Sequence, residues 1–265
     1  MKTIYTIGLD IGSTTSKGIV LKNGKDIVVN SIVPFGTGTF GPQRVMEELL
    51  KGAEITREDI DQLVVTGYGR VHFPGADKQV SELTCHAKGA RYLLPTAETV
   101  IDIGGQDAKV MKLNEKGNLM NFVMNDKCAA GTGRFLDVMA RIIGVDVSEL
   151  GPISGKANQI ASISSTCTVF AESEVISHLS SQIPVEDIVA GVHESVAKRV
   201  SSLAKRAGIQ GNIVLVGGVS KNTGVVKAME RALDTPIMTH ESAQLTGAIG
   251  SAIYAYNDFT KHMKE

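Results

Sequence analysis

The sequence reads GLDIGSTTSKGIVLKNG from Gly8 to Gly24 and VIDIGGQDAKVMKLNEKG from Val100 to Gly117. In both stretches an apolar run leads into an Asp-Ile-Gly turn, and a second run follows and ends in Asn, Lys and Gly residues. A lysine stands seven residues after each aspartate, Asp10 and Asp102. Apolar runs joined by a short glycine-containing turn are typical of β-hairpins. The repeat predicts two halves built on one plan, whose acid-bearing hairpins face each other across a cleft and hold a polyphosphate and its metal.

The composition excludes several classes of protein. The 265 residues suffice for one large or two modest domains. A net charge of −1 gives no strong attraction to nucleic acid or to an anionic membrane. Neither a membrane-spanning stretch nor a signal-peptide pattern is evident, so we expect a cytoplasmic protein. The three cysteines, Cys85, Cys128 and Cys167, are odd in number and far apart, which argues against a disulfide framework.

Strand and helix patterns alternate along the chain, which favours an α/β fold. Strands are expected at 3–10, 17–22, 26–34, 62–66, 99–103, 108–113, 119–124 and 212–216. Helices are expected at 42–52, 81–93, 185–207 and 243–256, and Gly208 should end the third of them. Pro95-Thr96, just before the second copy, is the natural boundary. It gives a first domain of residues 1–95, completed by a C-terminal helix at 243–265, and a second domain of residues 96–242.

The first hairpin loop has the chemistry of a phosphate site. Small and hydroxyl-bearing residues let backbone N–H groups approach phosphate oxygens closely. These residues are Gly12, Ser13, Thr14, Thr15 and Ser16. Lys17 adds a positive charge, and Asp10 is a hard oxygen ligand that suits Mg²⁺. Glycine motifs are unspecific, so a tight hairpin with an exposed hydroxyl-rich turn remains the alternative for this loop alone.

The second hairpin loop, DIGGQD, carries two acids beside a flexible turn. Gly104 and Gly105 let the backbone come close to a ligand. Asp102 and Asp107 suit Mg²⁺ and the orientation of an attacking water, and Gln106 suits the same water. The alternative is a Gly-Gly turn with a solvated aspartate.

A third element is NIVLVGGVSKNTGVVKAMERAL, from Asn212 to Leu233. A fully apolar strand leads into a glycine pair and then into a helix, an arrangement that aims a helix N-terminus and bare backbone at a ligand. Gly217 and Gly218 would let a flat base or a ribose lie against the backbone. By itself the element could belong to any α/β protein.

In this order the three elements resemble the acetate/sugar kinase, Hsp70 and actin superfamily. The resemblance implies two RNase H-like domains with ATP in the cleft between them. It makes the two hairpin loops the phosphate loops and Gly217-Gly218 the adenosine loop, with Asn222 and Gln244 on the adenosine side. The superfamily contains kinases, ATPases and filament proteins, so nucleotide binding alone does not settle function.

Two cysteines each lie shortly before an expected helix. Cys128 stands in NDKCAAGTGRFLDVMARIIG (125–144) and Cys167 in SISSTCTVFAESE (162–174). A helix N-terminus favours a thiolate or an anionic cluster, whereas a free cysteine is most often a buried apolar residue. Two thiolates cannot saturate an iron–sulfur cluster, but a symmetric dimer would supply four.

The segments 125–140, 162–180 and 76–90 together resemble the activator, component A, of the 2-hydroxyacyl-CoA dehydratases. This resemblance implies an oxygen-sensitive homodimer with one [4Fe-4S] cluster at its interface, held by Cys128 and Cys167 of each chain. Hydrolysis of Mg²⁺-bound ATP to ADP would change the angle between the helices that face the cluster. One low-potential electron would pass to the dehydratase, component D, from a ferredoxin or flavodoxin donor.

Other interpretations remain open at this point. A kinase for a small polyol or acid would use Asp102 or Asp107 as general base, and an ATP-dependent switch of the actin type would lack redox chemistry. Cys85 stands next to His86, where core packing is favoured over a metal pair, because adjacent helical residues point to different faces. The loop at 66–70 suits a partner contact, a cleft wall or a plain turn. Glu172 and Glu174 are assigned no catalytic role.

Overall fold

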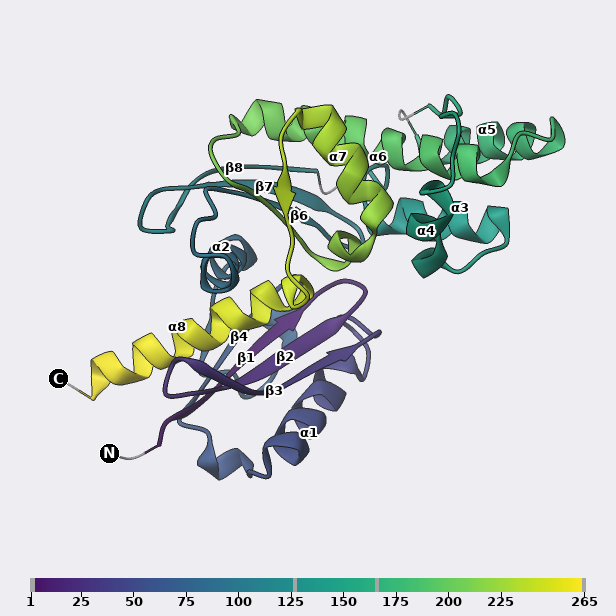
Figure 1. Ribbon diagram of the computed structural model, residues 1–265. Coiled ribbons are helices and arrows are strands. Elements are labelled where there is room, and N and C mark those ends of the chain that lie inside the picture. The colour runs from purple at the N-terminus through teal and green to yellow at the C-terminus, as the bar shows by residue number, and fades with distance from the viewer. Residues whose placement is uncertain (1–2, 126–127, 165–166, 264–265) are drawn as a thin grey trace. The chain divides into compact units, whose positions relative to one another are not determined.

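A computed structural model describes residues 3–125, 128–164 and 167–263 of the chain (Figure 1). Its strands are β1 (Tyr5–Ile11), β2 (Ser16–Lys22), β3 (Asp26–Val33), β4 (Gln62–Thr66), β5 (Lys78–Gln79), β6 (Thr99–Ile103), β7 (Ala108–Leu113), β8 (Leu119–Asn125), β9 (Ile213–Val216) and β10 (Ile237–Met238). Its α-helices are α1 (Gly41–Ala53), α2 (Glu82–Leu93), α3 (Gly133–Ile143), α4 (Leu150–Ser154), α5 (Thr168–Ser180), α6 (Val185–Ala207), α7 (Thr223–Leu233) and α8 (Thr246–His262). The predicted α/β architecture is confirmed.

The two sheets have the same topology. One has the strand order β3-β2-β1-β4-β5 and the other the order β10-β9-β6-β7-β8. In each, an antiparallel hairpin (β1–β2 or β6–β7) is extended by a strand that runs parallel to its first member, β4 or β9. The prediction of two halves built on one plan is therefore confirmed strand by strand.

The chain divides into two compact units. The first consists of Met1–Thr96, Leu113–Leu119 and Ser242–Glu265, and the second of Ala97–Lys112 and Met120–Glu241. The first unit thus contains both ends of the chain, and α8 belongs to it. Among the described residues no helix is both long and apolar enough to cross a membrane.

Both faces of the first sheet are covered. Alternate residues of a strand point to opposite faces, so Val20 joins a core with Val45 and Leu49 of α1. Its neighbours Ile19 and Leu21 join the core that α8 covers. Figure 1 shows α8 lying along this sheet and α1 on its other side.

The second unit has the larger core, which draws on α3, α5, α6 and α7 as well as on the sheet. The apolar stripe of α6 predicted from the sequence is buried there: Ile188, Val192, Val196, Val200 and Leu203. Gly208 ends this helix in the left-handed conformation, at φ 74°, as expected.

The structure corrects the sequence-based boundaries at a few places. Strands β5 and β10 were not predicted, because each contains two residues and cannot show a period. The last helix starts at Thr246 and not at 243, since Ala243–Leu245 form a separate 3-10 turn.

Candidate functional site

The first hairpin loop is a tight turn closed by its own backbone. The amide of Gly12 donates to the carbonyl of Thr15 at 3.0 Å. Ser13 and Thr15 are half-buried, and Thr14 is exposed. Ser16 differs from them, because it is buried in β2 and its hydroxyl donates to the carbonyl of Phe35 at 2.8 Å. The loop therefore presents three hydroxyl side chains, and the fourth is committed to the fold.

Asp10 and Lys17 face each other across the hairpin. They are directly paired residues of β1 and β2, which explains why the lysine follows the aspartate by this spacing. Lys17 Nζ lies 3.2 Å from Asp10 Oδ2, and the aspartate is only 3% exposed. His86 of α2 lies on the same oxygen, with Nε2 at 4.0 Å. No local pattern in the sequence points to this third residue, because only the packing of α2 brings it to the hairpin.

The second hairpin repeats this geometry with one more acid. Gly104 donates to the carbonyl of Asp107 at 2.9 Å, the counterpart of the bond that closes the first loop. Lys109 is paired with Asp102 across β6 and β7, and its Nζ lies 3.4 Å from Asp102 Oδ2 and 2.8 Å from Asp107 Oδ2. Lys109 is 3% exposed, and of the two carboxylates that balance its charge Asp102 is buried and Asp107 is half-buried. Gln106 is exposed at the tip of the loop.

A glycine backs each aspartate from the neighbouring parallel strand. Thr66 ends β4 opposite Asp10, and Val216 ends β9 opposite Asp102. The next residues, Gly67 and Gly217, have φ values of 86° and 84°. A Cβ atom on Gly67 would lie 2.5 Å from Asp10 Oδ1, and one on Gly217 would lie 2.4 Å from Asp102 Oδ1. Both glycines directly follow the last residue of an apolar strand, Thr66 or Val216, and this is the sequence signal for their shared position. It assigns a structural role to Gly67 in the loop at 66–70, for which a partner contact, a cleft wall and a plain turn had been left open.

The residues expected at the adenosine lie in different units. Gly217 and the 3-10 turn Gly218–Lys221 belong to the second unit. So does Asn222, whose Oδ1 caps α7 by accepting from Gly224 N at 3.0 Å and Val225 N at 3.1 Å. Gln244 is half-buried in the 3-10 turn of the first unit.

The second loop is bonded directly to the start of α3. The amide of Gly133 donates to the carbonyl of Gly104, and the amide of Arg134 donates to the carbonyl of Gly105, both at 2.8 Å. Two of the amides that a helix leaves unpaired at its N-terminus are satisfied in this way. A displacement of the Gly-Gly turn therefore acts on the first turn of this helix.

The cysteines have contrasting surroundings. Cys167, predicted to lie just ahead of a helix, is the N-cap residue of α5. Cys128 lies in the loop before α3, which begins only at Gly133, and the side-chain Nδ2 of Asn125 donates to the Cys128 carbonyl at 2.9 Å. Both are half-buried, whereas Cys85 is fully buried and its burial raises the pKa of the thiol to about 12. The described part of the chain has no group of three or more His, Cys, Asp or Glu side chains that could hold a metal.

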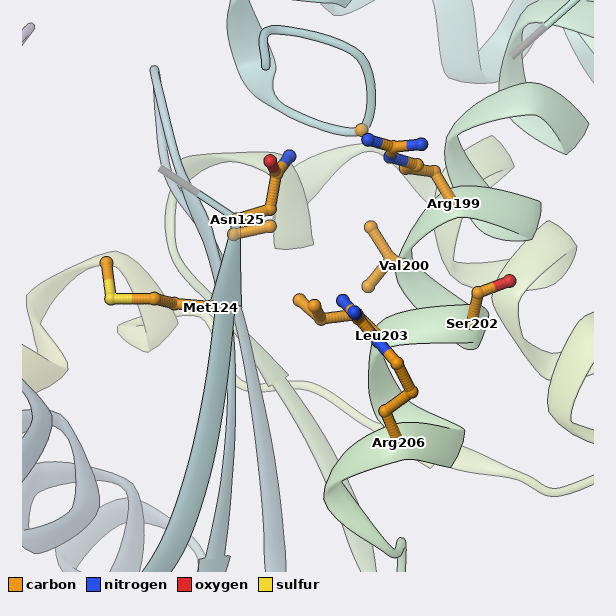
Figure 2. A pocket seen from close by; sticks show the side chains of 9 residues that line it. Met124, Asn125, Arg199, Val200, Ser202, Leu203 and Arg206 are labelled. Atoms are coloured by element: carbon orange, nitrogen blue, oxygen red, sulfur yellow. The ribbon is translucent and has the colours of Figure 1, made fainter. Parts of the chain in front are cut away.

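A hollow of about 350 Å³ lies between β8, α6 and the loop that carries Cys128. Figure 2 shows Asn125 at the end of the strand and the long side chains of Arg199 and Arg206 on the facing helix. Arg199 also touches the loop, since a Cβ atom on Gly131 would lie 2.9 Å from its Cγ. None of the described residues that line this hollow is acidic. It is a cationic surface next to a cysteine.

Helix α5 has exposed apolar residues beside Cys167. Val169 and Phe170 are 65% and 64% exposed, and Ile176 is also exposed. Large apolar side chains grouped on one exposed element are typical of protein–protein contacts.

Known proteins resemble this chain over nearly its whole length. Residues 7–255 match the BadF/BadG/BcrA/BcrD ATPase family. The 2-hydroxyisocaproyl-CoA dehydratase activator of Clostridioides difficile is 62% identical over 262 residues, which cover 99% of this chain and 98% of that protein. The (R)-2-hydroxyglutaryl-CoA dehydratase activating ATPase of Acidaminococcus fermentans is 55% identical over 98% of this chain and its own full length.

A solved structure agrees with these sequence relations. The activator of the 2-hydroxyisocaproyl-CoA dehydratase from Clostridium difficile, solved with bound ADPNP, superposes with a TM-score of 0.96 at 61% identity. The match covers 98% of this chain and 97% of that structure. With the repeated hairpins, their acids and their glycines in place, the chain belongs to the BadF/BadG/BcrA/BcrD ATPase family.

Proposed function

We propose that this ATPase activates a 2-hydroxyacyl-CoA dehydratase by delivering one low-potential electron to it in a step driven by ATP hydrolysis. The electron carrier in this proposal is a [4Fe-4S] cluster shared by the two chains of a homodimer. The activator names of the high-identity relatives support the dehydratase as partner. The identity of its hydroxyacyl-CoA is set by that partner and not by this chain.

Nucleotide binding is assigned to the repeated hairpins and the glycine pair. In the first unit, the loop from Gly12 to Thr15 and Lys17 would bind phosphate oxygens, and Asp10 would hold Mg²⁺. In the second unit, Asp102 and Asp107 with Gln106 would orient water, Gly104 and Gly105 would approach a phosphate, and Gly217 with Gly218 would receive the nucleoside. The assignment is supported by two nearly buried carboxylates, hard ligands of the kind that Mg²⁺ takes.

The cluster is assigned to Cys128 and Cys167. Both residues are half-buried, and Cys167 caps the start of a helix, whose N-terminal dipole favours negative charge. Each chain contributes two thiols, so a second copy would complete the four ligands of a [4Fe-4S] cluster. When bound, such a cluster supplies a one-electron carrier whose potential depends on charge, hydrogen bonds and solvent access.

The pair of hydrogen bonds between the second loop and α3 carries the coupling proposal. These bonds tie the turn assigned to phosphate, Gly104-Gly105, to Gly133 and Arg134 at 2.8 Å each. The loop of Cys128 ends where this helix begins, and Thr132 closes it by donating to the carbonyl of Ala129. A change of nucleotide state would therefore reach the cysteine loop through two backbone contacts.

The homodimer is assigned to the exposed apolar side chains of α5. Burying Val169 and Phe170 against a second copy would remove apolar area from water next to the shared thiols. We expect Phe170→Glu to lower the dimer fraction measured by light scattering, with Phe122→Glu, an exposed apolar residue of β8, as the matched control. Equal effects of both substitutions would contradict this interface.

The electron donor is assigned to the acidic one-electron carriers, ferredoxin or flavodoxin. The arginine-lined hollow beside the Cys128 loop supports this choice by charge complementarity. Reversing Arg199 and Arg206 to glutamate should slow reduction by the donor at low salt, and added salt should shrink the difference between variant and wild type. A difference that does not depend on salt would argue against electrostatic docking.

The cluster proposal is tested by anaerobic purification followed by iron and acid-labile sulfide analysis. We expect about four of each per dimer, lost in air. Cys128→Ser and Cys167→Ser should abolish the brown colour. Cys85→Ser should retain it, because this thiol is fully buried with a raised pKa. An iron-free, colourless dimer would overturn the proposal and redirect the search to small-molecule acceptors of phosphate.

The coupling proposal is tested at the start of α3. A Cβ atom on Gly133 would lie 3.2 Å from the carbonyl oxygen of Gly104, so Gly133→Ala presses on the hydrogen-bonded contact without removing a side chain. We expect more ATP hydrolysed per electron delivered than in the wild type. Gly144→Ala, at the other end of the same helix, has open space and a φ of 83°, so it controls for backbone strain in this helix away from the second loop. An unchanged ratio in Gly133→Ala would contradict the coupling path.

A further inference from the structure

His86 is a buried polar residue beside the carboxylate of the first hairpin. It is 6% exposed, and its Nε2 lies 4.0 Å from Asp10 Oδ2, the oxygen that Lys17 approaches to 3.2 Å. Its other ring nitrogen, Nδ1, lies 2.9 Å from Thr246 Oγ1 of α8. The imidazole thus lies between Thr246, at the start of α8, and Asp10 of β1.

The ring nitrogens have separate partners. The hydroxyl of Thr246 lies 2.9 Å from Nδ1 of His86 and 3.2 Å from the carbonyl of Ala243, and as a donor to Nδ1 it leaves the ring proton on Nε2. With Nδ1 used in this way, Nε2 is the nitrogen that faces Asp10. A buried hydroxyl therefore fixes which edge of the imidazole meets the carboxylate.

The two helices that carry these groups are in direct backbone contact. A Cβ atom on Gly89 of α2 would lie 1.9 Å from the carbonyl oxygen of Thr246, and one on Gly250 of α8 would lie 1.9 Å from that of Cys85. Neither position has room for any side chain, so α2 and α8 meet without intervening atoms. Such contacts leave little freedom for His86, which sits between the two glycine contacts.

The carboxylate is enclosed on the same side. A Cβ atom on Gly247 would lie 2.7 Å from Asp10 Oδ2 and 3.1 Å from His86 Nε2, so the first turn of α8 packs against both groups. Gly67 packs against the other oxygen, Oδ1. Asp10 is therefore fixed by backbone on two sides and by polar side chains at Oδ2.

We propose that His86 is a positioning residue for ATP hydrolysis, whose Nε2 faces Asp10 Oδ2 beside Lys17 and keeps the carboxylate in one orientation toward its ligand. Thr246 sets the orientation of the ring. The proposal rests on the role assigned to Asp10 above. It gives a task to the histidine next to Cys85, which the sequence suggested only as the other half of a poorly placed metal pair.

Two substitutions of similar size separate the polar role from packing. His86→Leu keeps the volume and removes both nitrogens, whereas His86→Gln restores a polar end group at the distance of Nε2. We expect His86→Leu to lower kcat for ATP about 10- to 100-fold, the range typical of residues that orient a ligating group, with a much smaller change in KM. His86→Gln should recover most of the loss.

Binding and stability are measured alongside turnover. The Mg²⁺-dependent gain in ADP affinity should fall in His86→Leu and return in His86→Gln, and thermal unfolding should report the packing cost of each. Ala90→Gly, a buried change on the same helix, controls for a loosened α2. Thr246→Val should resemble His86→Leu in a milder form, and Thr246→Ser should be near wild type.

The outcomes distinguish this inference from the site assignment on which it rests. If Asp10→Asn retains activity, the role of Asp10 is wrong. If Asp10→Asn is inactive while His86→Leu keeps kcat within about twofold of the wild type, or matches His86→Gln and Ala90→Gly, the positioning role of His86 is wrong and the assignment of Asp10 stands.

Discussion

The two hairpins have the same backbone arrangement, but the charged side chains around it differ. In both, an aspartate pairs with a lysine across the strands, the loop is closed by the same amide–carbonyl bond, and a glycine with φ near 85° backs the acid. In the first unit one carboxylate, Asp10, meets Lys17 and His86. In the second, one buried lysine meets two carboxylates. The repeated backbone thus fixes the position of the aspartate in each hairpin. The residues that are not repeated, His86 in the first unit and Asp107 in the second, decide which charges surround that aspartate.

We expect the largest effect from substitutions of the aspartate that occupies the same position in both hairpins. Asp10→Asn and Asp102→Asn each keep the shape and remove the charge, and we expect each to lower the ATPase kcat by at least about 100-fold. Steady-state kinetics with a thermal unfolding check would measure this. Asp234→Asn is the control, because Asp234 has φ 49° and asparagine tolerates that conformation. If only one of the two variants loses activity, the hairpins are unequal in function as well as in charge.

Removing the lysine should lower the unfolding free energy by a different amount in each hairpin. Lys109→Met leaves the buried Asp102 and the half-buried Asp107 without their common cation, and the unpaired buried charge should cost about 3 to 5 kcal/mol of unfolding free energy. Lys17→Met should cost less, because Lys17 is half-buried and pairs with one acid of its hairpin loop. Urea unfolding compares them. Equal losses of unfolding free energy would show that Asp107 does not increase the stabilising effect of Lys109.

Acid should reveal a further difference, because the second unit contains a histidine that is costly to charge. Burial lowers the pKa of His193 from 6.5 to about 4, and its Nε2 has no hydrogen-bond partner among the described atoms. The unfolded chain therefore binds a proton between these values while the folded chain does not. The free energy of unfolding should fall as the pH drops from 6.5 to 4, by roughly 3 kcal/mol.

His193→Gln should make the unfolding free energy less dependent on pH in that window, as measured by urea unfolding at pH 7, 5.5 and 4.5. His72→Gln, an exposed position, should leave the slope unchanged. A wild-type slope in His193→Gln would mean that other groups cause the acid sensitivity.

The smallest expected effect concerns the glycine that packs against the aspartate in each hairpin. Gly67→Ala and Gly217→Ala force a side chain into the left-handed region and against an aspartate oxygen, and each should cost at least about 1 kcal/mol. Gly144→Ala shares the strained φ of 83° but has open space, so it isolates the backbone term. Thermal unfolding of the three variants would show whether the two hairpins respond alike. A cost no greater than that of Gly144→Ala would deny that these glycines press on the acids.

The features that the sequence predicted well are local ones. The Asp–Lys pairs follow from the hairpin turn, because antiparallel pairing puts residues at that spacing opposite each other. Helix α6 was predicted to its last residue because its apolar stripe is continuous and a glycine ends it. Both signals are contained in short stretches of chain.

The features that were missed depend on distant contacts. His86 reaches Asp10 only because α2 packs on α8, whose Thr246 is far along the chain. The N-cap use of Asn222 and the bond from Ser16 to Phe35 also redirect groups that composition alone would leave free for a ligand. In each case a polar group is satisfied by a neighbour that no local pattern identifies.

The position of α8 in the first unit has a consequence for synthesis on the ribosome. Ile19 and Leu21 emerge early, but the residues that cover them, Ile249 and Ile253 among others, are the last helix to be made. At the usual elongation rates the wait lasts on the order of 10 to 50 seconds. The first sheet to be synthesised is thus the last to be enclosed, and its apolar face is the surface that a nascent-chain chaperone would meet.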